Sequence, residues 1–293
     1  MIPRLSSVVK RHPIITFFVL AYALAWIIES PLVFLTDSVT DTQVLVVQIL
    51  SANVPSVVAI VLTAIVFGRG ALRKLLARLL IWRVNPFWYL VVILGPVALT
   101  AGVLPLNALL GGPTLSVAMP LAGVAFFLAF SIFPGSALGE EIGWRGYALP
   151  RLQSRMSALS ASLILGPIWA LWHLPLWLTG DPYKTPTFYV PFFFSVIALS
   201  VILTWVYNST GGSLLLVVLL HATYNLPMTL AEEDVGTRAT LPVLLYFGLL
   251  VGAAIVVVIV AGPKHLSRKH RKQEEVAAES GVATPGVVKP TPA

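Results

Sequence analysis

Eight apolar runs, each about as long as a bilayer-spanning helix, occupy nearly all of the chain between residues 14 and 261. A helix needs about 20 apolar residues to cross a hydrocarbon core of ~30 Å. Apolar residues make up 57% of the chain and its mean hydropathy is +0.89, whereas soluble domains are roughly 45–50% apolar. We therefore predict an all-α polytopic membrane protein with about eight transmembrane helices. The runs lie at 14–35, 43–67, 86–110, 120–148, 158–178, 188–207, 212–228 and 241–261.

Lysine and arginine are distributed unevenly over the segments between these runs. If both termini lie in the cytoplasm, 17 of the 19 basic residues fall on the cytoplasmic side, and Lys184 and Arg238 fall outside. Cytoplasmic loops of membrane proteins carry such an excess. We therefore expect both termini to be cytoplasmic, and we interpret the net charge of +7 as topology and contact with anionic lipid. It indicates no nucleic-acid partner.

The chain divides into one membrane domain, residues 1–262, and one tail, residues 263–293. The tail begins with a basic stretch, "PKHLSRKHRK", and continues with Ala, Gly, Val, Pro and Thr in no apolar pattern. Such a composition favours disorder. Between the second and third runs, residues 69–83 place leucines at helical spacing opposite basic residues. This pattern predicts an amphipathic helix on the cytoplasmic face.

Cysteine is absent from the chain. Disulfides, thiolate metal ligands and cysteine nucleophiles are therefore excluded, so any catalysis must use oxygen and nitrogen groups. A compact chain without cysteine favours a prokaryotic plasma membrane as its location.

Two adjacent glutamates and an arginine stand in the stretch "GEEIGWRGYAL", in a chain with only 11% charged residues. The preceding apolar run, residues 121–133, is too short to cross a bilayer. We therefore expect the helix to continue through Glu140 and Glu141 and to end at Pro150. Arg145 lies four residues after Glu141, on the same helical face, so these two can pair. Glu140 needs a different partner, because an unpaired charge inside a membrane is costly.

Two other runs carry matching polar residues. His173 lies in "PIWALWHLPLW", and His221 lies in "LLHATYNLP" with Asn225 four residues later on the same face. A lone intramembrane histidine is usually a packing residue, but two histidines and an unpaired glutamate on three apolar helices indicate function. Glutamate beside imidazoles can deprotonate water, either directly or through a divalent metal. An amide N–H suits a developing oxyanion, so together these groups predict hydrolysis of an amide bond.

The motifs resemble those of the CPBP family, whose members include type II CAAX prenyl endopeptidases and the bacteriocin-processing or immunity proteins called Abi. "EEIGWRGYALPRL" is similar to the family's E-E-x-x-x-R motif, "WALWH" to its aromatic-and-histidine motif, and "HATYN" to its histidine-and-asparagine motif. The resemblance covers residues 120–227. It implies that residues 1–262 form a CPBP-type intramembrane protease domain.

The resemblance also implies a role for each matching residue. Glu140 activates the attacking water, and His173 helps to hold that water. His221 and Asn225 stabilise the oxyanion or help to bind metal.

The remaining matches shape the site. The resemblance implies that Glu141 and Arg145 fix its geometry. Trp169 stands where the family usually has phenylalanine, a change that we expect to affect cavity size more than chemistry. Glu29, in "IIESP", is a further intramembrane carboxylate, expected near the outer end of the first span, and we assign it no catalytic role.

The need for a metal is open at this point. His173, His221 and Glu140 would suffice as three zinc ligands with one open position, and they would serve equally in a site without metal.

We therefore predict an intramembrane endopeptidase of the CAAX-protease type, with a water-filled cavity that opens to the cytoplasmic side. Its partners are the lipid bilayer and a membrane-associated substrate: a prenylated peptide, a leader peptide or another membrane protein. Two other classes fit the same residues. A non-catalytic interaction or immunity protein could use the scaffold to bind a membrane protein. A transporter could use Glu140 and the histidines as a proton relay, although no internal repeat is visible.

Overall fold

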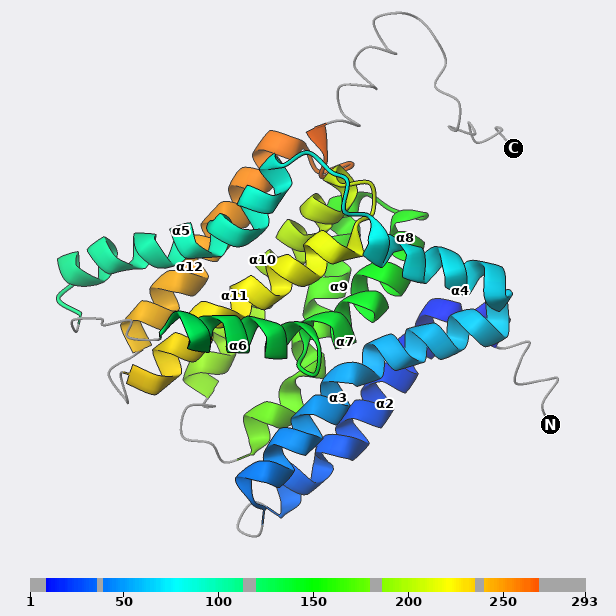
Figure 1. Ribbon diagram of the computed structural model, residues 1–293, viewed down its shortest axis with the longest axis horizontal. Coiled ribbons are helices and arrows are strands. Elements are labelled where there is room, and N and C mark those ends of the chain that lie inside the picture. The colour runs from blue at the N-terminus through cyan, green and yellow to red at the C-terminus, as the bar shows by residue number, and fades with distance from the viewer. Residues whose placement is uncertain (1–8, 36–38, 113–119, 180–185, 235–239, 269–293) are drawn as a thin grey trace, which may run out of the picture.

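The computed structural model describes residues 9–35, 39–112, 120–179, 186–234 and 240–268, and every regular element in these ranges is helical (Figure 1). Seven helical segments are long and apolar enough to cross a membrane, and a shorter apolar helix lies at Leu214–Leu226. Each of the eight predicted runs is therefore helical, which confirms the all-α membrane fold. The longer helices are α2 (Pro13–Phe34), α3 (Asp41–Leu62), α5 (Phe87–Leu109), α9 (Ala158–Trp172), α10 (Pro186–Ser209), α11 (Leu214–Asp234) and α12 (Thr240–Ala261).

The helices form two groups that meet at the fourth span. Helix α10 packs between α9 and α12, while α5 packs on α11 and α12. Helices α2 and α3 form an antiparallel pair beside this bundle (Figure 1). The short helix α7 (Ala137–Glu141) and the π-helix η4 (Ile142–Ala148) pack on both α3 and α11. The segment with the two glutamates therefore joins the two groups.

Helix α3 runs into a π-helical stretch, Thr63–Phe67, and the chain then turns at Gly68, whose φ is +81°. A positive φ is readily adopted only by glycine. Helix α4 (Gly68–Ala77) follows, with Leu75 buried and Arg69 exposed, and the single 3₁₀ turn Arg78–Leu80 ends the helical segment. The expected amphipathic helix is confirmed, but it ends before residue 83.

The fourth span is interrupted rather than continuous. Helix α6 (Leu121–Ile132) is followed by a turn at 133–136, where Gly135 N donates to Phe130 O at 2.8 Å. Helicity resumes with α7 and η4, and it continues past Pro150 in α8 (Leu149–Gln153). The expectation that the helix ends at Pro150 is wrong. Pro150 is the second residue of α8, directly after the π-helix. Proline has no N–H to donate, and it is tolerated here because the backbone hydrogen-bond pattern changes from π-helical to α-helical at this point.

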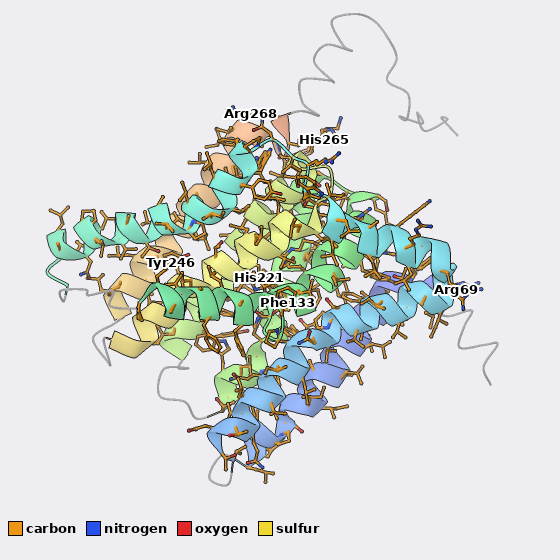
Figure 2. All side chains as sticks on the ribbon, in the orientation of Figure 1. Arg69, Phe133, His221, Tyr246, His265 and Arg268 are labelled. Atoms are coloured by element: carbon orange, nitrogen blue, oxygen red, sulfur yellow. The ribbon has the colours of Figure 1, made fainter. Side chains whose placement is uncertain are left out.

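The connecting segments at one end of the bundle carry the basic residues. Apart from Arg145, every Lys and Arg of the described residues lies within residues 9–12, 68–86, 149–157 and 262–268. We call this end the basic end; Arg69, His265 and Arg268 mark it along the upper and right-hand edge of Figure 2. Hydrogen bonds join these segments and the α10–α11 turn to one another: Ala158 N to Lys264 O (2.9 Å), Asn208 Nδ2 to His265 O (2.7 Å) and Ser213 Oγ to Ile81 O (2.7 Å).

Residues 263–268, expected to begin the tail, are folded onto this end. The side chains of Leu266 and Ser267 are fully buried. The rest of the tail, residues 269–293, for which we expected disorder, lies outside the described residues.

Candidate active site

Two glycines allow the glutamate-bearing segment to lie directly against the backbone of α3. A Cβ atom on Gly139 would lie 2.6 Å from Ala52 O, and one on Gly143 would lie 2.6 Å from Pro55 O. Such distances are too short for any other residue. Ser56 Oγ also donates to Leu138 O at 2.8 Å. These contacts set the depth and rotation of α7, and so the position of the adjacent carboxylates.

Glu141 and Arg145 form a fully buried ion pair. Arg145 Nη1 lies 2.8 Å from Glu141 Oε1, and both side chains have no exposed surface. The same carboxylate oxygen accepts from His221 Nδ1 at 2.7 Å, and the Arg145 guanidinium lies 4.1 Å from the ring centre of Trp169. The predicted pairing is confirmed. Because both charges are buried, removing one would leave the other uncompensated.

Glu140, the neighbouring carboxylate, is 2% exposed. Trp169 Nε1 donates a hydrogen bond to Glu140 Oε2 at 2.5 Å. The partner that Glu140 was expected to need is therefore an indole on α9. We expected the tryptophan at this position to affect cavity size more than chemistry, and that expectation is incomplete, because phenylalanine has no N–H to donate.

Both histidines are oriented through Nδ1. His173, the C-terminal cap of α9, holds its Nδ1 2.8 Å from the carbonyl oxygen of Trp169. His221 holds its own Nδ1 against Glu141. A carbonyl and a carboxylate can only accept, so Nδ1 carries the proton in each ring, which leaves Nε2 for other partners.

Asn225 is held by serines from the fourth span. Its Nδ2 donates to Ser136 Oγ at 3.0 Å and to Ser131 Oγ at 3.5 Å. The sequence patterns we used do not identify these serines as site residues. A weak signal exists, since Ser136 is one helical turn before Glu140 and therefore on the same face.

Glu140, His173, His221 and Asn225 line one cavity of about 390 Å³. The structure thus brings together four of the six predicted site residues, and Glu141 and Arg145 lie behind them. Figure 2 shows His221 near the centre of the molecule. The other lining residues come from α2, α3, α6, the end of α9 and the segments that follow α6 and α9: Glu29, Leu45, Gln48, Ile49, Ser51, Ala52, Phe130, Gly135, Ser136, Trp172 and Leu176.

Three of these lining residues add to what the sequence indicated. Glu29, to which we assigned no catalytic role, is buried in the same cavity as Glu140. Leu45 and Gln48 belong to the first turns of α3, at the end of the bundle away from the basic residues. We expected the cavity to open to the cytoplasmic side, and the side on which it opens stays a prediction.

The ionisable side chains of the site are too dispersed to form a metal-binding cluster. Within the part of the chain that the structure describes, no three His, Asp or Glu side chains gather closely enough to hold a metal ion. His173, His221 and Glu140 therefore do not fit a three-ligand zinc site in this arrangement.

Known proteins are similar to this chain over the segment that contains the same three motifs. Residues 120–227 match the model of a family described as type II CAAX prenyl endopeptidase Rce1-like. The motif core of this chain is thus similar to that family. The chain is also 35% identical over 127 residues to CAAX prenyl protease 2 of Methanococcus maripaludis, a match that covers 41% of this chain and 46% of that protein. The chain thus matches about half the length of the relative, and the matched family is one of proteases.

Proposed function

We propose that the protein is an intramembrane endopeptidase that hydrolyses a peptide bond of a membrane-associated substrate, such as a prenylated or leader peptide. One observation carries this proposal: a carboxylate, two imidazoles and an amide from three spans line a single cavity. The Rce1-like core and the name of the archaeal relative support the same reaction class. The similarity to an archaeal protein also supports a prokaryotic plasma membrane as its location.

In the proposed reaction, Glu140 acts as the general base. It takes a proton from a water molecule that His173 Nε2 helps to hold, and the water oxygen attacks the carbonyl carbon of the substrate. Asn225 stabilises the oxyanion that forms by donating an amide N–H, and His221 Nε2, which carries no proton in this tautomer, lies beside it as an acceptor. Glu140 then passes the proton to the leaving amine as the C–N bond breaks, so carboxylic acid and amine products form with no net change in the enzyme.

Each proposed role has support from the hydrogen bonds of the site. Trp169 leaves Glu140 Oε1 available for water, because its indole engages Oε2. Glu141 orients His221, as carboxylates commonly do for functional histidines. Ser136 orients the amide of Asn225. The proposed steps use these residues alone and pass through no metal ion.

The decisive experiment compares Glu140→Gln with Asp41→Asn in the purified protein. Asp41 is an exposed carboxylate at the start of α3, outside the cavity, so its neutralisation is a matched control. We expect Glu140→Gln to lose cleavage of a membrane-associated peptide by at least about a hundredfold, as general bases contribute 10²–10⁴-fold. Asp41→Asn should keep wild-type activity. Full turnover by Glu140→Gln would reject the proposal.

Complementation in cells separates catalysis from the alternative, a non-catalytic immunity or interaction protein on the same scaffold. If Glu140→Gln and His173→Ala preserve cellular function while peptide cleavage is lost, the scaffold acts by binding. Loss of both supports the endopeptidase.

A further inference from the structure

The active-site cavity lies in the half of the bundle remote from the basic end. Helix α3 begins at Asp41, at the end opposite the basic one, and Leu45 and Gln48 line the cavity from its first turns. Glu29 lies five residues before the end of α2, at Phe34. On the fifth span the lining residues, such as Leu176, come from the last turns.

Toward the basic end the cavity is closed by packed side chains. Every residue from Gly139 to Leu149 is buried, and Trp144, Arg145 and Tyr147 have no exposed surface. Trp169, which precedes the lining residues of α9, is 2% exposed. At the opposite end the lining includes Leu45, which is 45% exposed, and Gln48, which is partly exposed, whereas Glu29 is buried.

We infer that the substrate reaches Glu140 from the membrane face opposite the basic end, which is the non-cytoplasmic face. Lysine and arginine mark the cytoplasmic side of membrane proteins, and the described basic residues other than Arg145 gather at one end. The substrate class is then a peptide segment exposed on the outer face, such as a translocated or secreted peptide. This inference rests on the proposed endopeptidase function for its catalytic part, and on charge and geometry for the side of entry.

The absence of cysteine makes the side of entry directly measurable. Gln48→Cys places one thiol in the cavity, and Ser154→Cys places one on an exposed site at the basic end. In intact cells a membrane-impermeant maleimide should label Gln48→Cys, while Ser154→Cys should react only after the membrane is opened. The reverse pattern overturns the inference, and so does a Gln48→Cys thiol that reacts from neither face.

A cleavage assay in sealed vesicles keeps this inference separate from the proposed function. A peptide added outside right-side-out vesicles should be cut, and the same peptide added outside inverted vesicles should not. Cleavage restricted to inverted vesicles overturns the side of entry but keeps the enzyme. If the labelling pattern is as expected but no peptide is cut from either side, the proposed function fails and the topology stands.

A second cavity, at the basic end, carries an independent inference. It has a volume of about 640 Å³ and shares no lining residue with the active-site cavity. It lies where α5 begins and where α10 and α12 end. Its polar and aromatic lining includes Arg83, Trp88, Trp205, Ser209, Ser267 and Arg268.

The lining of this second cavity is suited to an anion. It contains two arginines and no acidic residue, and neither Arg83 nor Arg268 forms a salt bridge within the described residues. The hydroxyl oxygens of Ser209 and Ser267 are buried and have no hydrogen-bond partner among the described residues. The whole Ser267 residue is fully buried. Buried polar atoms normally have partners. Trp88 and Trp205, with ring centres 4.8 Å apart, add the apolar wall typical of a membrane interface.

We propose that this second cavity binds a phosphate group, supplied by the headgroup of an anionic phospholipid. Arginine matches phosphate oxygens geometrically, and basic pockets between membrane helices on the cytoplasmic side bind anionic headgroups. The acyl chains would lie along the neighbouring apolar helix surfaces.

The test compares two double variants that remove the same charge from the same end. Arg83→Gln/Arg268→Gln changes the second cavity, and Arg73→Gln/Arg155→Gln changes exposed arginines outside it. Phosphatidylglycerol retained after purification is counted by native mass spectrometry, with and without inorganic phosphate. We expect a several-fold loss of bound lipid in the first variant alone. Equal retention in both variants overturns the site, and complete displacement by millimolar inorganic phosphate overturns the lipid as its source.

Discussion

The Trp169 indole N–H points at Glu140 Oε2 from 2.5 Å, while the backbone carbonyl of the same tryptophan accepts from His173 Nδ1 at 2.8 Å. One residue on α9 therefore orients both the proposed base and the histidine beside it. Its ring also covers Arg145, at 4.1 Å. Trp169 thus links the carboxylate of one span to the imidazole of another.

Replacing Trp169 by phenylalanine should lower kcat with little change in KM. The backbone carbonyl that orients His173 is retained, but the hydrogen bond to Glu140 is lost. A hydrogen bond to a charged group is worth about 1.5–3 kcal/mol, so we expect roughly a tenfold or greater loss. Steady-state kinetics of the purified enzyme provide the measurement. Trp177→Phe, which removes an indole that packs on Tyr189 outside the cavity, is the matched control and should be near wild type.

Replacing Glu141 by glutamine should destabilise the fold rather than only the chemistry. Arg145 would keep its charge in a fully buried position without a carboxylate, which typically costs about 3–5 kcal/mol. Unfolding in detergent micelles measures this loss. The double variant Glu141→Gln/Arg145→Met should recover part of the stability without recovering activity, because His221 would still lack its carboxylate. An unchanged midpoint for Glu141→Gln would show that the pair is not buried as described.

Replacing Gly143 by alanine should displace the site. The new Cβ would meet the Pro55 carbonyl at 2.6 Å, and backbone cannot move away as a flexible side chain can. We expect lower thermal stability together with lower kcat. Gly95, in α5, has open space where its Cβ would lie, so Gly95→Ala should be neutral or slightly stabilising, since alanine favours helix by about 1 kcal/mol. Equal behaviour of the two variants would contradict the close packing of α3 on the π-helix.

Removing divalent metal should leave cleavage intact. The arrangement of His173, His221 and Glu140 does not match a three-ligand zinc site, so we expect less than one equivalent of zinc in the active wild type and in His221→Ala. Elemental analysis and a peptidase assay after dialysis against a chelator would measure this on the same samples. Activity that disappears with the chelator and returns with added zinc would refute the metal-free steps.

Much of the fold could be predicted from the sequence because its signals are local. Apolar runs long enough to cross a bilayer identify the helices, and the uneven distribution of basic residues identifies the end at which their connections gather. The Glu141–Arg145 pair follows from helical periodicity alone, since residues four apart share a face. The motifs around Glu140, His173 and His221 identified the candidate chemistry in the same way.

The tertiary structure decided what depends on contacts between distant segments. A hydropathy pattern does not register the turn at 133–136, and no spacing rule pairs Glu140 with Trp169 or Asn225 with Ser136. The end of the bundle from which residues line the cavity is of the same kind. Each depends on the depth and rotation of one helix against another, which are set by close contacts such as Gly143 on Pro55, so they become visible only when the helices are packed together.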